Sequence, residues 1–202
     1  MRKEGIGFVL IGLAAACAGG WFHPALAAPG ALFSAFCAYF FRDPDRTPPT
    51  DPALILSPGD GRVLTVAQEG PGKIVTVRIF LSVFDVHVQR LPCSGTVEKV
   101  HYQPGAFHMA MDKEARENER SVVTIKVAGR SETLVVEQIA GYVARRIHTW
   151  LKVGDRAVSG ERYGLIQFGS QAAVHLPETA EALVKPGDRV SAGLTPIARW
   201  RA

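Results

Sequence analysis

Cysteine is scarce in this sequence, and its few cysteines are far apart. The chain holds only Cys17, Cys37 and Cys93, without a C-x-x-C pair. This pattern argues against a disulfide framework and a cysteine zinc site, and it favours a reducing compartment. A strong excess of positive charge is also lacking, because 23 Lys and Arg stand against 19 Asp and Glu. The net charge of +4 falls far short of a nucleic-acid-binding surface but suits an anionic membrane surface.

Charge is absent altogether from one long segment near the start of the chain. Gly5 to Phe41 contains no Asp, Glu, Lys or Arg, although charged residues flank it on both sides. A single helix through it would measure roughly 55 Å, well beyond the bilayer core of about 30 Å. The segment is therefore expected to turn back at residues 21–30, where aromatic residues and prolines gather, leaving apolar arms at Ile6–Gly20 and Ala31–Phe41.

This pattern predicts a hydrophobic, helical membrane anchor within residues 1–46, as a hairpin or a re-entrant segment. The basic flanks place it on the cytoplasmic side of the cell (inner) membrane. A secretory signal peptide is the alternative, because Ala25-Leu26-Ala27 resembles a cleavage site. Cleavage there would leave the apolar run from Phe33 to Phe41 exposed at a new amino terminus. A buried core helix is a second alternative, but the charge-free run is too long to favour it.

The remainder, residues 47–202, has the texture of a single mainly β domain. Short β-branched runs alternate with Gly, Pro and Asp, and a helical piece is expected only at Gly141–Ile147. The expected strands are Leu54–Leu56, Gly61–Ala67, Lys73–Leu81, Gly95–Tyr102, Ser121–Val127, Glu132–Ala140, Gly164–Phe168 and Ala172–Leu176.

An apolar, Gly-Asp, apolar pattern recurs three times, at residues 56–63, 151–158 and 184–190. Each copy reads as a turn that feeds a strand. Such turns recur in barrel-sandwich hybrid folds, so the expected fold class is mainly β (α+β), with a barrel-sandwich-hybrid-like domain behind the anchor. For Asp155 and Asp188 we expect turn chemistry alone.

Three weak signals mark a candidate site. Gly169-Ser170 is the only Gly-Ser dipeptide and lies between two strand-like runs, yet a turn serine is the simpler interpretation. His87 lies among apolar residues beside a turn, where a histidine is more often structural. Asp60 lies in the tight loop Ser57–Gly61, where a carboxylate either orients a histidine or caps the turn.

Together these segments resemble the phosphatidylserine decarboxylase proenzymes, in their shorter bacterial branch, and the resemblance runs nearly end to end. The motifs that carry it appear in family order. They are Tyr39–Arg46, Ser57–Gly61, Phe84–Val88 with Arg90–Pro92, Tyr102, Pro104–Phe107, Asp112-Lys113, Glu117–Arg120, Gln138–Gly141, Ala144–Ile147 and Phe168–Ser170.

The resemblance implies a self-processing enzyme. Asp60 would hold His87 in one tautomer, and His87 would take the proton from the Ser170 hydroxyl. Ser170 would then attack the Gly169 carbonyl, as in a serine-nucleophile triad turned on its own backbone. Cleavage would leave a β chain, residues 1–169, and an α chain, residues 170–202, which remain associated. The cofactor would be a pyruvoyl group derived from Ser170.

The implied reaction converts phosphatidylserine in the membrane to phosphatidylethanolamine and CO2, a step of phospholipid biosynthesis. The pyruvoyl ketone would form a Schiff base with the substrate amine and act as an electron sink. His87 would return a proton to the substrate carbon. Arg90, Arg145 or Arg146 would bind the phosphate, although a solvated role is equally open for each of them. A homodimer is also left open.

Two departures from the family pattern limit the transfer of roles. Longer members carry a second histidine where this chain has Arg90, and they follow the cleavage serine with threonine where this chain has Gln171. Three other readings remain: a decarboxylase of a related serine lipid such as an ether lipid, a non-catalytic membrane-bound relative, and a different class of protein.

For the last reading, a lipoyl-type carrier would need a lysine between methionines at a hairpin tip, and Met109–Lys113 differs from that pattern. A zinc peptidase would need an H-x-H pair, which Val86–Gln89 lacks. No metal site is predicted, because ligand-like spacing is lacking among the remaining histidines of the domain. They are His101, His108, His148 and His175.

Overall fold

The structure is a computed structural model of the whole chain, and it describes residues 1–69, 72, 74–106, 108, 117–141, 146–168 and 170–201. The chain divides into two compact units, Met1–Asp45 and Arg46–Ala202. The boundary predicted from the sequence lies after Arg46.

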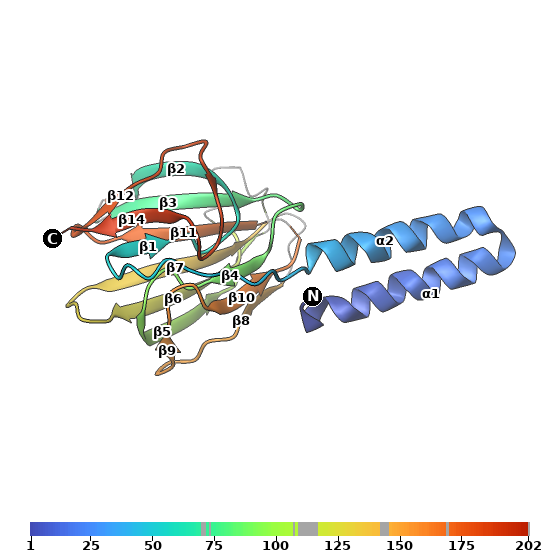
Figure 1. Ribbon diagram of the computed structural model, residues 1–202, viewed down its shortest axis with the longest axis horizontal. Coiled ribbons are helices and arrows are strands. Elements are labelled where there is room, and N and C mark those ends of the chain that lie inside the picture. Colours follow the sequence, from blue (N-terminus) through green and yellow to red (C-terminus); the bar gives the residue numbers. More distant parts are fainter. Residues whose placement is uncertain are drawn as a thin grey trace. The chain divides into compact units, whose positions relative to one another are not determined.

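The first unit is a helical hairpin. The helices are α1 (Ile6–Phe22) and α2 (Ala27–Phe40), with short 3-10 helices η1 (Lys3–Gly5) and η2 (Pro24–Leu26), and they run antiparallel (Figure 1). The turn is shorter than the expected residues 21–30. Pro29 lies in the first turn of α2, where no amide donor is required, so it does not interrupt the helix.

Small residues let the two helices pack closely. A Cβ added at Gly30 would overlap the backbone nitrogen of Ala16, and one added at Gly12 would lie 2.8 Å from the Ser34 nitrogen. The Ser34 hydroxyl donates to the Val9 carbonyl oxygen over 3.1 Å. The hairpin is therefore held by close backbone approach, the mode of packing that membrane helices use.

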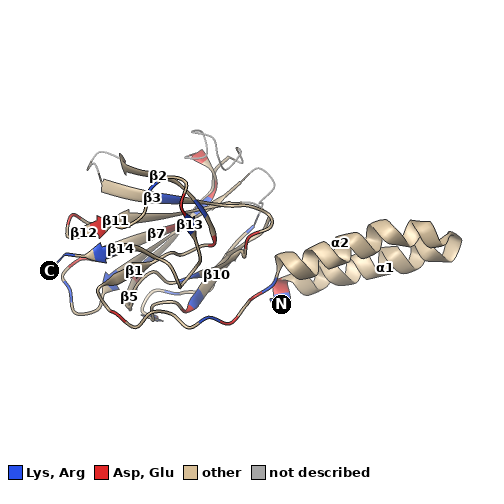
Figure 2. Ribbon diagram, turned by 45° about the horizontal axis from the view of Figure 1, so that its top comes forward, with Lys and Arg blue, Asp and Glu red and all other residues tan. Residues whose placement is uncertain are grey.

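The outside of the hairpin is apolar. Figure 2 shows both helices without charged residues along their length, and Trp21 and Phe22 at the end of α1 are 88% and 82% exposed. The helix Lys3–Phe22 is long and apolar enough to cross a membrane. This surface is compatible with the expected membrane anchor.

The second unit is mainly β, as the sequence predicts. Its strands form an eight-stranded sheet in the order β13-β2-β3-β11-β7-β6-β5-β9 and two three-stranded sheets, β1-β14-β12 and β4-β10-β8. Their bounds are β1 (Leu54–Leu56), β2 (Gly61–Glu69), β3 (Ile74–Leu81), β4 (Val88–Arg90), β5 (Gly95–Gln103), β6 (Arg120–Val127), β7 (Thr133–Ala140), β8 (Ile147–Thr149), β9 (Arg156–Ala157), β10 (Arg162–Ile166), β11 (Ser170–Leu176), β12 (Ala180–Ala182), β13 (Arg189–Val190) and β14 (Pro196–Trp200).

One apolar cluster fills the space inside the curled eight-stranded sheet. Val77 and Ile79 of β3, Val174 of β11 and Val136 of β7 are fully buried in it, and Ile197 of β14 joins them from a second sheet. Alternate residues of each strand enter this cluster, which fixes the register, because a one-residue slip would turn the apolar set away from it.

Two local predictions are wrong at their last residues. The strand expected at Gly164–Phe168 ends at Ile166, and Phe168 instead has φ +62°. The helix expected at Gly141–Ile147 is a strand at its last residue, because Ile147 opens β8; residues 142–145 lie outside the described part of the chain. The short strands β4, β8, β9, β12, β13 and β14 were not predicted, although β1 and β10, which are of similar length, were.

Alanine substitutions at Gly30 and Gly7 should show whether close packing at Gly30 stabilises the hairpin. Gly30→Ala should destabilise the hairpin by about 1–3 kcal/mol through overpacking, whereas Gly7→Ala, whose Cβ meets no atom within 4 Å, should be neutral or stabilising through helix propensity. Thermal unfolding of the full chain in detergent, followed by circular dichroism, measures both. Equal effects of the two substitutions would contradict the packing account.

Candidate active site

Three neighbouring strands of the large sheet continue into three neighbouring strands of a small one. The order β3-β11-β7 in the first matches the order β4-β10-β8 in the second. The connections are residues 82–87 from β3 to β4, residues 141–146 from β7 to β8, and residues 167–169 from β10 to β11. Each connection therefore crosses from one sheet to the other, and the strand ends that the connections join lie in the same order in both sheets.

Ser170 is the first residue of the central strand after this crossing. It is opposite Leu81 of β3 on one side and Ala140 of β7 on the other. Its side chain is fully buried, and its hydroxyl has no hydrogen-bond partner in the described part of the chain. A buried hydroxyl without a partner is uncommon and calls for an explanation. Gly169, the expected cleavage partner, lies outside the described residues.

His87 ends the neighbouring crossing. It is fully buried, and its Nδ1 lies 3.0 Å from the backbone carbonyl oxygen of Asp85. A carbonyl only accepts, so Nδ1 carries the proton, and in a neutral ring Nε2 is the basic nitrogen. The Ile166 amide donates to the His87 carbonyl over 3.4 Å. His87 is thus tied to the end of β10, at the start of the segment that leads to Ser170.

Asp85 was missed as a site residue, although it lies in the segment that drew attention to His87. Its Oδ2 accepts from the Ser82 amide over 2.9 Å and its Oδ1 from Arg189 over 3.1 Å. These bonds shape the loop whose carbonyl orients the His87 ring. The spacing Ser82-x-x-Asp85, typical of a capped turn, was the available signal.

Asp60 has partners other than the one expected, and the expected hydrogen bond from Asp60 to His87 is not formed. Arg46 donates to both oxygens of Asp60, over 2.6 and 2.8 Å, and the Ala192 amide donates to Oδ1 over 2.8 Å. Arg46 also donates to the Ala192 carbonyl oxygen over 2.7 Å. Asp60 therefore clamps together three distant segments, and its catalytic role stays a prediction.

The other two Gly-Asp turns behave as expected. Asp155 accepts from the Lys152 amide over 2.8 Å, and Asp188 accepts from the Lys185 amide over 2.9 Å. Each carboxylate closes its own turn, which is ordinary turn chemistry. Of the three carboxylates, that of Asp60 is the one that bonds to distant segments among the described residues.

The candidate phosphate-binding arginines lie in different places. Arg90 is 5% exposed and donates to the Gly160 carbonyl oxygen over 2.9 Å. Gly160 precedes β10, whereas Ser170 follows the other end of that strand. Arg146 is exposed, and its carbonyl accepts from the Gln167 amide over 3.1 Å. Arg146 therefore lies beside the crossing that holds the Gly169-Ser170 bond, and Arg90 does not. Arg145 lies outside the described residues.

Gln171 projects from the face of the sheet opposite Ser170, because side chains alternate along a strand. Its Oε1 lies 3.4 Å from Arg78, which also makes paired hydrogen bonds to Glu69. Next to them, burial raises the pKa of Glu137, but the hydrogen bond and charge of His175 and the nearby arginine charges outweigh it, so this pKa lies below its usual value. A network of charged side chains therefore lies on the face of β11 opposite the Ser170 side chain.

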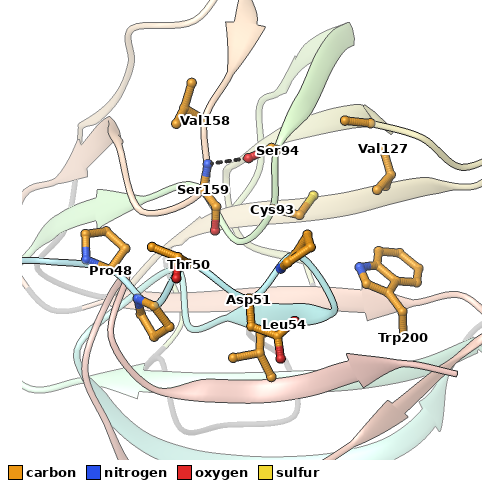
Figure 3. A pocket seen from close by; sticks show the side chains of 13 residues that line it. Pro48, Thr50, Asp51, Leu54, Cys93, Ser94, Val127, Val158, Ser159 and Trp200 are labelled. Atoms are coloured by element: carbon orange, nitrogen blue, oxygen red, sulfur yellow. Dashed lines mark hydrogen bonds between the residues drawn. The ribbon is translucent and has the colours of Figure 1, made fainter. Parts of the chain in front are cut away.

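A pocket of about 380 Å³ lies elsewhere in this unit (Figure 3). Pro48, Cys93, Ser94 and Trp200 are among its lining residues, whereas Ser170, His87 and Asp60 are not. Burial raises the pKa of the Cys93 thiol to about 12, so this cysteine is a poor nucleophile at neutral pH. Within the described residues, no three His, Cys, Asp or Glu side chains gather as a metal site.

Comparison with known proteins identifies the family. The family model described as phosphatidylserine decarboxylase matches residues 33–198. The chain belongs to the phosphatidylserine decarboxylase family. Phosphatidylserine decarboxylase proenzymes from Symbiobacterium thermophilum and Solibacter usitatus are each 46% identical to it, and the alignments cover 98% of this chain and 95% of each relative. The proenzyme from Anaplasma phagocytophilum is 42% identical, over 98% of this chain and 90% of the relative.

Membership confirms the resemblance seen in the sequence and makes this chain an enzyme of the decarboxylase family. The match begins within α2, at residue 33, and covers most of the β unit, including all three crossings. The interrupted central strand is thus part of the family's shared domain.

A double-mutant cycle should test the clamp at Asp60. Arg46→Gln should lower the free energy of unfolding by about 3 kcal/mol, because it leaves a mostly buried carboxylate without its cation. Asp60→Asn should cost a comparable amount, and the double variant should lose clearly less than the sum. Chemical denaturation of the full chain in detergent measures all four free energies. Additive losses would contradict a direct interaction.

Proposed function

We propose that this chain is a self-processing, pyruvoyl-dependent decarboxylase that converts phosphatidylserine to phosphatidylethanolamine and CO2. The observation that carries the proposal is the Ser170 hydroxyl, fully buried and without a hydrogen-bond partner in the described part of the chain. It stands where the central strand is interrupted, beside the crossing that ends at His87. Family membership supplies the reaction class.

The first step is an attack of the chain on its own backbone. Nε2 of His87 takes the Ser170 hydroxyl proton, and Oγ forms a bond to the Gly169 carbonyl carbon. The bond from that carbon to the Ser170 nitrogen breaks, and the nitrogen receives the proton from His87. An ester has replaced the amide, and the Ser170 nitrogen has become an amine.

The second step opens the chain. Loss of the Ser170 Cα proton and cleavage of its Cβ–Oγ bond release the Gly169 carboxylate. The enamine that remains rearranges to an imine, water adds, and ammonia leaves. Residue 170 is then a pyruvoyl group at the amino terminus of the fragment 170–202.

The surroundings of residue 170 fit such a group. A pyruvoyl group has no nitrogen, and β11 begins at this residue, so the loss of one backbone donor falls at the strand's end. Leu81 and Ala140, at the ends of the neighbouring strands, lie opposite it on either side. When present, the ketone supplies covalent attachment for the substrate amine and a sink for the electrons left by departing CO2. His87 then holds the proton that returns to the substrate carbon.

Strand pairing explains how the two chains would stay together. From residue 170 onward, β11 pairs with β3 over Ser170–Leu176 and with β7 over Ser170–His175. On the other side of the cut, β10 pairs with β4 and β8. The Asp60 clamp to Ala192 joins the two chains again. Cleavage would therefore cut one connection and leave both sheets intact.

The substrate's phosphate must lie close to the reacting carbon, because only the serine Cβ and one oxygen separate them. Arg146, exposed beside the crossing, meets this condition better than Arg90. The apolar helix α1 would keep the enzyme at the membrane, where the head group stays at the interface. We place the second unit on the cytoplasmic side, from the charged flanks of the hairpin.

Two substitutions test the chemistry. Ser170→Ala should abolish both chain cleavage and CO2 release, and His87→Ala should slow self-cleavage at least about 100-fold, as expected for loss of a general base. Denaturing gels of freshly synthesised chain and CO2 release from phosphatidylserine vesicles measure the two activities. Cleavage of the Ser170→Ala chain into the same fragments would overturn the assignment.

The two arginines form a matched pair for the phosphate contact. Arg146→Gln should raise KM for phosphatidylserine about tenfold or more with a smaller change in kcat, because a charge-assisted bond to the head group is lost. Arg90→Gln should change KM far less and chiefly lower stability, through its lost bond to Gly160. Steady-state kinetics in mixed micelles distinguish them. A larger rise of KM for Arg90→Gln would place the head group at the far end of β10.

A further inference from the structure

Phe168 has an unusual backbone conformation two residues before the proposed cleavage serine. Its φ is +62°, and it is the only residue other than glycine with a positive φ in the described part of the chain. For an L-residue with a large side chain this left-handed region is strained, because Cβ crowds the backbone carbonyl. Asparagine and glycine occupy it more readily.

Pairing on both sides of the crossing explains why the strain persists. Before Phe168, Ile166 is opposite Ile147 in the sheet. The backbone amide of Gln167 donates to the Arg146 carbonyl oxygen, and the Gln167 side-chain nitrogen Nε2 lies 3.1 Å from His148 Nε2. After it, Ser170 is fixed between β3 and β7. The chain is held at Gln167 and again at Ser170, and few residues join these two points. The surroundings therefore impose the conformation of Phe168.

We propose that Phe168 is a positioning residue for self-cleavage, whose strained backbone favours transfer of the Gly169 acyl group from nitrogen to oxygen. This inference rests on the proposed function. In the amide, one atom, the Ser170 nitrogen, links the Gly169 carbonyl carbon to the Ser170 Cα. In the ester, two atoms, Oγ and Cβ, make that link. The tether is one atom longer, so Phe168 can return to a negative φ.

The strain therefore exists before the transfer and is relieved after it. A residue that is comfortable at positive φ removes this difference and should slow the transfer. Alanine keeps the Cβ and the strain without the ring, whereas glycine lacks both. Phe168→Ala and Phe168→Gly differ by one methyl group, which makes them a matched pair, and Phe168→Asn is intermediate.

The test is the first-order rate of chain cleavage in freshly synthesised full-length protein. Phe168→Ala should cleave about five- to tenfold faster than Phe168→Gly, with Phe168→Asn between them. A structural role of the ring would slow Ala and Gly alike, and this result would overturn the inference. So would a Gly variant that cleaves as fast as the Ala variant.

A second measurement reads the strain without cleavage. In a Ser170→Ala background, Phe168→Gly should melt about 2–4 °C higher than Phe168→Ala, because only alanine is strained at positive φ. An Ala variant that melts at or above the Gly variant would contradict strain at this position. If the wild-type chain never cleaves, the proposed function fails and the inference fails with it. If the wild type cleaves and the Ala and Gly rates agree, only the inference fails.

Discussion

Pairing of the central strand on both sides is the constraint on which the rest of the structure depends. β11 is hydrogen-bonded to β3 and β7, and β10 is hydrogen-bonded to β4 and β8. Between them, the described residues Gln167 and Phe168 belong to neither strand. The fold thus isolates one stretch of backbone in the middle of a stable sheet and buries the first side chain after it. A chain that cuts itself there loses little of its structure.

The sequence could predict much of this arrangement, and the rest was beyond it for physical reasons. The apolar hairpin and the long strands have strong patterns, since charge is absent over Gly5–Phe41 and apolar residues alternate along β3, β6 and β11. Short strands such as β4 and β8 form only because long strands bring them together. The conformation of Phe168 likewise depends on two distant pairings and leaves no local signal.

Asp60 shows the same limit at the level of one side chain. Its loop looks like the turns at Asp155 and Asp188, yet those carboxylates bind their own turns and Asp60 binds Arg46 and Ala192. The choice of partner is made by segments more than a hundred residues apart in sequence, and residue type alone does not reveal it. The clamp also links the residue that follows the hairpin unit to both halves of the proposed cleaved enzyme, which gives Asp60 a structural task whatever its chemical one.

Intact-mass measurement of the purified protein under denaturing conditions tests the central claim most directly, with and without borohydride and an amine. The account predicts two chains, one ending at Gly169 and one spanning residues 170–202 whose first residue carries a ketone that the reagents modify. A single chain of about 21.8 kDa that the reagents leave unchanged would contradict it. Two chains whose short fragment begins with an intact serine would show cleavage by another route and would contradict the pyruvoyl group.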